Sequence, residues 1–249
     1  MSESWSRSSF AGRRPLLTVA GFPVVVPWTA WAGIALIAAV NAPTFRDAGG
    51  TVATVAFAAG LYCTVLVHEL AHAVVARVTG HRVLGIELGI LGGATAYLPE
   101  VHPNPKHELR VAVAGPAASL ASGMLLEGIG RGARTMGLDT IGVVLIAIGV
   151  MNVFLAALNL LPAAPLDGGH VCEAIVWRLT HSRRTGMRVT AVLGYLIGTF
   201  AVWTGLLLAT IDGEILVFLG FILMLNAAAL WRQSRPRPRP GRSARRFRP

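Results

Sequence analysis

The chain has 249 residues, of which 54% are hydrophobic and 14% are charged, and its formal net charge is +10. Soluble globular domains carry about 25% charged residues. The composition therefore excludes an ordinary soluble domain and predicts an integral membrane protein. The two cysteines, Cys63 and Cys172, lie in or beside apolar stretches, which indicates packed thiols rather than the cysteine framework of a secreted protein.

The predicted elements begin with an extended segment. Residues 16–27 contain Pro23, Pro27 and the run Val24–Val26, which disfavours a helix and favours a strand. Six apolar stretches follow, and most approach the ~20 residues that a helix needs to cross a bilayer. They are residues 28–44, 51–79, 109–128, 140–161, 189–210 and 214–231.

Residues 83–98, between the second and third apolar stretches, predict a short β-hairpin. Apolar and other side chains alternate from Ile86 to Ile90, and a glycine pair, Gly92–Gly93, precedes a second short run. A re-entrant loop is the alternative. The predicted fold class is an all-α polytopic membrane protein, with about six transmembrane helices and a small membrane-associated β-hairpin or sheet.

Charge patterning predicts the domain limits and the orientation. Residues 1–15 are predicted to be a cytoplasmic segment, 16–231 a six-span domain and 232–249 a disordered basic cytoplasmic tail with eight arginines and four prolines. With the N-terminus inside, 19 of the 22 Lys and Arg residues fall on the cytoplasmic side, as the positive-inside rule expects. We therefore expect a multi-pass protein of the cell (plasma) membrane with both termini in the cytoplasm.

The second apolar stretch contains His68, Glu69 and His72. Residues four apart lie on one face of a helix, so two imidazoles at this spacing can hold one zinc ion while the glutamate acts on a bound water. Ionisable side chains inside a membrane are costly and are functional candidates. The alternative is a polar, hydrogen-bonded cluster between helices.

A catalytic zinc site usually has three protein ligands and one open position. Asp167 is the candidate for the third, because it follows the fourth span after Pro162 and Pro165 and precedes Gly168–Gly169. Prolines and glycines there predict a broken helix whose extended part carries the carboxylate. A cytoplasmic turn without a metal is the alternative, and the neighbouring His170 is a weaker candidate ligand.

Two motifs together resemble those of the site-2 protease family of intramembrane zinc metalloproteases, which are peptidase M50-like. They are His68–His72 in one span and Asn159–Gly168 at the end of a later one, and the resemblance extends from about Phe22 to Trp231. Two positions depart from the family pattern: Ser119 stands where many members have asparagine, and Ala157 where an aromatic residue is frequent.

The resemblance implies a membrane-associated sheet that Val24–Val26 would join, and it implies a role for each motif residue. His68, His72 and Asp167 would bind one zinc ion per chain, Glu69 would be the catalytic acid and base, and Asn159 would contact the substrate or its oxyanion. Residues 16–231 would be the protease domain of a minimal member, without PDZ or CBS domains.

The implied activity is hydrolysis of a peptide bond within or near a transmembrane segment. The substrate would be a membrane protein with a single transmembrane segment, such as an anti-sigma factor or a tethered transcription regulator cut in regulated intramembrane proteolysis. An edge strand of the 83–98 hairpin would pair with the unwound substrate. The basic tail would contact anionic lipids, and no nucleic acid is expected. The alternatives are a membrane metal-binding or transport protein and an inactive substrate-binding relative.

Overall fold

The computed structural model describes residues 15–47, 49–90, 92–98, 103–208 and 210–235. The predicted N-terminal segment 1–15 and the predicted tail 232–249 lie almost entirely outside the described residues, so the tail and its lipid contacts stay predictions. Four strands, seven α-helices and one 3-10 turn form the described part of the chain. In chain order they are β1 Leu17–Val19, β2 Phe22–Val25, α2 Trp28–Asn41, the 3-10 turn Ala42–Phe45, α3 Gly50–Val78, β3 Arg82–Gly89, β4 Gly92–Leu98, α4 Pro105–Thr135, α5 Asp139–Asn159, α6 Asp167–Thr180, α7 Arg183–Leu208 and α8 Ile211–Gln233.

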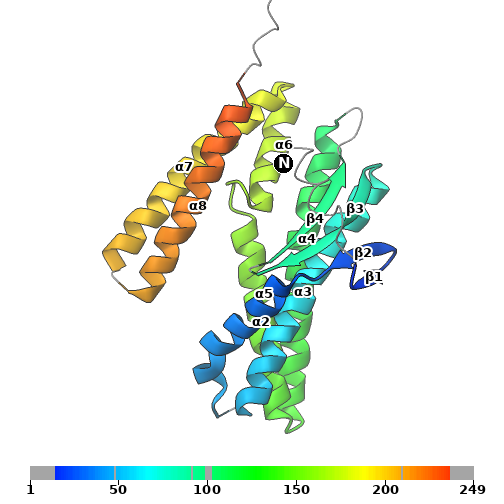
Figure 1. Cartoon of the computed structure of the whole chain (residues 1–249), viewed down its shortest axis with the longest axis vertical. Helices are drawn as coiled ribbons and strands as arrows, with labels where there is room; N and C mark the ends of the chain where they lie inside the picture. The colour runs from blue at the N-terminus through cyan, green and yellow to red at the C-terminus, as the bar shows by residue number, and fades with distance from the viewer. Residues whose placement is uncertain (1–14, 48, 91, 99–102, 209, 236–249) are drawn as a thin grey trace, which may run out of the picture. The chain divides into compact units, whose positions relative to one another are not determined.

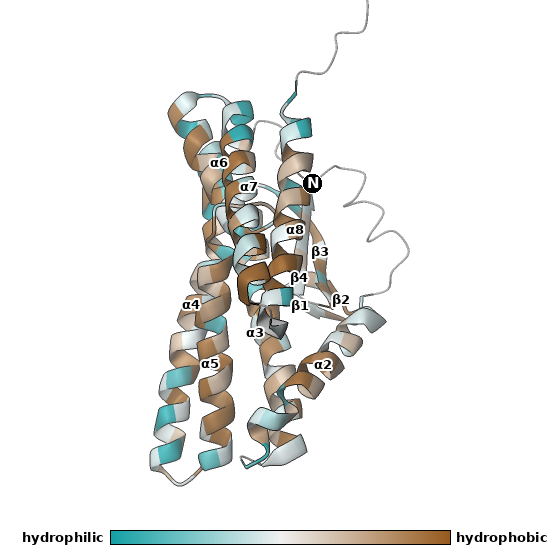
Figure 2. Ribbon diagram, turned by 90° about the vertical axis from the view of Figure 1, so that its left-hand side faces the viewer, coloured by the Kyte–Doolittle hydropathy of each residue, from teal (hydrophilic) through white to brown (hydrophobic). Residues whose placement is uncertain are grey.

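Six segments among the described residues are long and apolar enough to cross a membrane, as predicted. They are Trp28–Phe45, Gly50–Val78, Pro105–Thr135, Asp139–Asn159, Arg183–Leu208 and Gly213–Gln233. Their residues are mostly hydrophobic in Figure 2, and hydrophilic residues gather toward the end of α4 that leads into α5. The predicted fold class, a polytopic helical membrane protein with a small sheet, is confirmed.

Two of these helices begin four or more residues before their apolar stretches. α4 begins at Pro105 instead of residue 109, because the Asn104 side chain accepts a hydrogen bond from the Lys106 backbone N–H and caps the helix. α7 begins at Arg183 instead of residue 189. Hydropathy predicts which part of a helix can lie in the bilayer. The capping residue determines where the helix itself begins.

The four strands form one sheet in the order β1-β2-β3-β4. β3 and β4 are antiparallel and Ile86 pairs with Thr95, so the predicted hairpin is confirmed. β2 pairs with β3 in parallel through Val24 and Ile86, as expected for the valine run. In this order β4 is an edge strand (Figure 1).

The chain divides into two compact units. The first comprises residues 1–161 and 166–171, and the second comprises 162–165 and 172–249. In the first unit, one buried cluster joins the sheet to α3 through Phe22, Val24, Ile86 and Tyr62. A second cluster joins α3 to α5 through residues such as Phe57 and Ile148. Helix α3 therefore packs against the sheet and against a second helix.

In the second unit, α7 and α8 pack closely through small residues. A Cβ added at Gly198 would lie 2.7 Å from the Gly220 carbonyl oxygen, and one at Gly220 would lie 2.6 Å from the Gly198 oxygen. Small residues at such contacts let membrane helices approach to backbone distance.

The prediction for the stretch after the fourth span is wrong in one respect. Asp167 does not lie on an extended segment, because it is the first residue of α6. The break between α5 and α6 is confined to Leu160–Leu166, where the two prolines lie. The carboxylate of Asp167, in the first turn of α6, interacts favourably with the positive end of the helix dipole. This interaction favours a helix that begins at Asp167, although Gly168 and Gly169 predicted irregular backbone.

A candidate metal centre between α3 and the start of α6

Helix α3 presents two different faces at its middle. His68 and His72 lie one turn apart on one face, with 7% and 6% of their surface exposed. Glu69 is as deeply buried, with 7% exposed, but its carboxylate faces β4. The two histidines are therefore one helical turn apart, as the sequence predicts. They contact Asp167, whereas Glu69 contacts Thr95 of β4.

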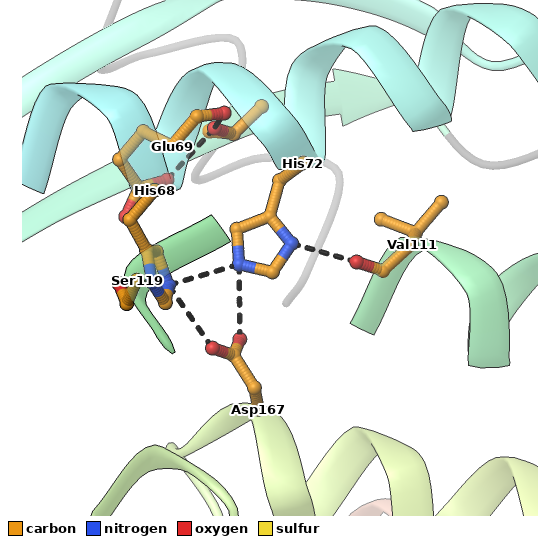
Figure 3. A network of polar contacts seen from close by, with 7 residues as sticks. His68, Glu69, His72, Val111, Ser119 and Asp167 are labelled. Atoms are coloured by element: carbon orange, nitrogen blue, oxygen red, sulfur yellow. Dashed lines mark hydrogen bonds and ion pairs between the residues drawn. The ribbon is translucent and has the colours of Figure 1, made fainter. Parts of the chain in front are cut away.

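Asp167 lies against the two imidazoles (Figure 3). Its Oδ2 atom is 3.1 Å from His68 Nε2, and its Oδ1 atom is 3.4 Å from His72 Nε2. The two Nε2 atoms are themselves 3.1 Å apart. Burial acts to raise the pKa of Asp167, but its hydrogen bonds with the two histidines outweigh burial, and the pKa ends below its ordinary value. The carboxylate of Asp167 thus faces both imidazole nitrogens at once.

The facing atoms of these three residues have the spacing of ligands around one ion. In a tetrahedral site with zinc–ligand distances of about 2.0–2.1 Å, neighbouring ligand atoms are about 3.3–3.4 Å apart. The separations here are 3.1 Å between the two Nε2 atoms, 3.1 Å from His68 Nε2 to Asp167 Oδ2 and 3.4 Å from His72 Nε2 to Asp167 Oδ1, so each carboxylate oxygen faces one imidazole. Two imidazole nitrogens and one carboxylate oxygen leave the fourth position open, and that donor set fits a catalytic zinc site.

Each imidazole has a partner at its other nitrogen. His72 Nδ1 is 2.7 Å from the Val111 carbonyl oxygen on α4, which can only accept, so Nδ1 carries the proton and Nε2 is free to bind a metal. His68 Nδ1 is 2.9 Å from the hydroxyl of Ser119, one more residue of α4. Such partners orient ligand imidazoles and increase their basicity.

The sequence did not identify these partners. Val111 acts through its backbone, which no side-chain pattern can reveal. Ser119 was noticeable only as a departure from the asparagine of related sequences. The hydroxyl of Ser119 can accept a hydrogen bond from Nδ1–H of His68.

Gly115 makes the close approach of α4 possible. A Cβ at this position would overlap His72 Nε2 and would lie 2.5 Å from His68 Nε2. Gly115 is buried within α4, one turn before Ser119. The two residues therefore contribute space and a hydrogen bond to the same pair of imidazoles.

Glu69 contacts the hairpin. The Thr95 hydroxyl of β4 is 2.7 Å from Glu69 Oε2 and 2.9 Å from the Glu69 carbonyl oxygen. Gly93 is equally close, since a Cβ there would lie 2.5 Å from Glu69 Cγ. The side chain of Glu69 is thus in contact with β4, an edge strand of the sheet.

Within the described ranges, one group of His, Cys, Asp and Glu side chains is close enough to hold a metal, and it consists of His68, His72 and Asp167. His170 does not belong to it. Asn159 is the last residue of α5 and is half-buried. Its proposed contact with substrate stays a prediction.

Comparison with known proteins agrees with this arrangement. The model of peptidase family M50 matches residues 56–133 and 128–204, which include the histidine motif of α3 and Asp167. The chain is 33% identical over 175 residues to sll0528 of Synechocystis sp., covering 68% of this chain and 45% of that protein. It is 38% identical over 181 residues to Rip3 of Mycobacterium tuberculosis, covering 71% and 38%. The names of both relatives refer to zinc metalloproteases.

The chain spans less than half the length of these two curated relatives. Among solved structures, it resembles the site-2 protease from Methanocaldococcus jannaschii with a TM-score of 0.60, covering 91% of this chain and 97% of that one. The two sequences are 22% identical, and the match shows a shared fold. The family model extends over more than half of the sequence, and the chain belongs to peptidase family M50.

Proposed function

We propose that this chain is an intramembrane zinc metalloendopeptidase that hydrolyses a peptide bond within or near a transmembrane segment of another membrane protein. The observation that carries the proposal is that Asp167 meets His68 and His72, and that these two histidines and Glu69 lie in a helix apolar enough to span a bilayer. Buried ionisable groups at such a position are expensive to maintain, which favours a catalytic role over a structural one.

Each site residue has a role in the proposed reaction. His68, His72 and Asp167 would hold zinc, whose chemistry at such a site is activation of a water molecule and polarisation of the scissile carbonyl. Glu69 would accept the proton of the attacking water and return it to the leaving amine. Asn159 would contact the substrate or its oxyanion.

The position of β4 supports an extended substrate. A helical segment hides its peptide bonds in its own hydrogen bonds, so it has to unwind before it can be cut. β4 ends the sheet, and its residue Thr95 contacts Glu69. A substrate strand that paired with the edge of β4 would therefore run close to the proposed base.

The substrate we propose is a membrane protein with a single transmembrane segment, such as an anti-sigma factor or a tethered transcription regulator released by regulated proteolysis. We also propose that the chain resides in the cell membrane with both termini in the cytoplasm, because 19 of its 22 Lys and Arg residues would then lie inside. A metal-binding or transport protein would have no need of Glu69 beside the ligands, and an inactive relative would usually have lost a ligand or this glutamate.

The first experiment compares the wild type with Glu69→Gln, which keeps the shape of the side chain but removes its basicity. Glu127→Gln is the control, because Glu127 pairs with exposed Arg131 on α4. The full chain is purified in detergent, its zinc content is measured, and cleavage of a panel of single-span substrates is assayed in proteoliposomes. We expect about one zinc per chain in all three proteins and cleavage by the wild type and the control only. Full cleavage by Glu69→Gln would exclude this mechanism, and zinc binding without cleavage by any variant would favour the metal-binding alternative.

A further inference from the structure

The carboxylate of Glu69 has one side-chain hydrogen-bond partner in the described part of the chain, and this is Thr95. The hydroxyl lies 2.7 Å from Oε2 and 2.9 Å from the carbonyl oxygen of the same residue. A hydroxyl has a single proton, so the two oxygens share one donor. The Thr95 hydroxyl therefore bridges the Oε2 atom and the backbone carbonyl oxygen of Glu69. The other carboxylate oxygen, Oε1, does not take part in this contact.

The hairpin that carries Thr95 contacts α3 at a second point. The hydroxyl of Tyr62 lies 2.6 Å from the Ile90 carbonyl oxygen and 3.0 Å from that of Gly89, at the end of the hairpin where β3 turns into β4. Tyr62 and Glu69 are seven residues apart, about two helical turns, and so share one face of α3. Two contacts on one face, one from the turn and one from β4, therefore hold the hairpin against the helix.

Register and close packing complete the placement. Thr95 pairs with Ile86, which is fully buried in the core between sheet and helix. Gly93, two residues earlier on the same face of the strand, has no side chain and so admits the stem of Glu69. The hydroxyl of Thr95 is therefore placed against Glu69 by a paired strand and not by a flexible loop.

We propose that Thr95 is a positioning residue for the reaction, which holds the Glu69 carboxylate beside the metal ligands and makes the position of this base depend on strand β4. The inference rests on the proposed function. Since the edge of β4 is where an extended substrate would pair, one hydroxyl links the strand that receives the substrate to the group that moves the proton.

Three variants of the full chain test this role. Thr95→Val keeps the shape and removes the hydroxyl, Thr95→Ser keeps the hydroxyl, and Thr180→Val is the control, because the Thr180 hydroxyl is exposed and bonds to Val176 of its own helix. A hydrogen bond to a charged group corresponds to roughly a 10- to 100-fold effect on rate when it is needed at the transition state. We expect Thr95→Val to lower kcat by about that factor, with KM within about twofold of wild type because the strand edge is intact.

Two further measurements separate positioning from folding. Bound zinc should be the same in Thr95→Val and Thr180→Val, and Thr95→Ser should recover most of the lost kcat. Infrared difference spectra between each protein and its Glu69→Gln counterpart isolate the Glu69 carboxylate band, which should shift in Thr95→Val and not in Thr95→Ser. This spectral test does not need a substrate.

The outcomes are distinct. An unchanged kcat and an unchanged carboxylate band in Thr95→Val would overturn the role of Thr95 even if the wild type cuts its substrate. An equal loss in Thr95→Ser and Thr95→Val, or loss of zinc from either, would also overturn it, since the residue would then act through packing. If the proposed function is wrong, the wild type will bind zinc but cut no substrate, and this result differs from both outcomes above.

Discussion

At the scale of single residues, the site depends on the absence of a side chain at Gly115. We predict that Gly115→Ala loses most of its bound zinc, because the added methyl group would occupy the space of His72 Nε2 and lie 2.5 Å from His68 Nε2. Gly128→Ala on the same helix is the matched control, since a Cβ there meets nothing within 4 Å. Elemental analysis of the purified variants measures the effect. Full zinc occupancy in Gly115→Ala, together with an intact fold, would contradict the geometry described here.

At the scale of elements, a buried polar contact fixes α3 to α5. The Asn152 amide, 1% exposed, donates to the Thr64 hydroxyl at 2.9 Å, and Thr64 lies one turn before His68. We predict that Asn152→Leu destabilises the protein by about 1 kcal/mol, the order of an interhelical hydrogen bond in a membrane protein. Asn226→Leu is the control, because Asn226 donates to Ile222 within its own helix.

Reversible unfolding in mixed detergent micelles measures both changes. The double variant with Thr64→Val tests the contact itself, because its two effects should not add if the residues are partners. Strict additivity would mean that the amide stabilises α5 alone.

At the scale of the whole molecule, the proposed zinc would join distant parts of the chain. His68 and Asp167 are 99 residues apart in sequence (167 minus 68) and 3.1 Å apart in space. A ligand that binds only the folded state stabilises it by about 2.7 kcal/mol at 100 times its dissociation constant. We predict that a strong chelator lowers the melting temperature and abolishes cleavage, and that added zinc restores both.

The variant His68→Ala is the control for chelation. It should melt below the wild type and should not respond to the chelator, because its site is already incomplete. An equal response of both proteins would place the effect of the chelator elsewhere in the molecule.

The features that could be predicted from the sequence have local causes. Long apolar runs marked the six spans, and spacing by four placed His68 and His72 on one face of a helix. Alternation before Gly92–Gly93 marked the hairpin. The start of α6 at Asp167 was missed, because prolines and glycines indicate a break without showing how soon a helix resumes. The division into two compact units was invisible too, since apolar spans look alike in sequence whichever partner they pack against.

The sequence by itself determined which groups are available for chemistry: two imidazoles and a carboxylate at helical spacing, a later aspartate, and an apolar setting that makes them costly. Only the tertiary structure decided how they meet. It places Asp167 against the two histidines, gives His68 the hydroxyl of Ser119 and turns Glu69 toward Thr95. The reason is physical: periodicity and propensity act between near neighbours along the chain, whereas these contacts join residues 26 to 99 positions apart and exist only once helices and strands have packed.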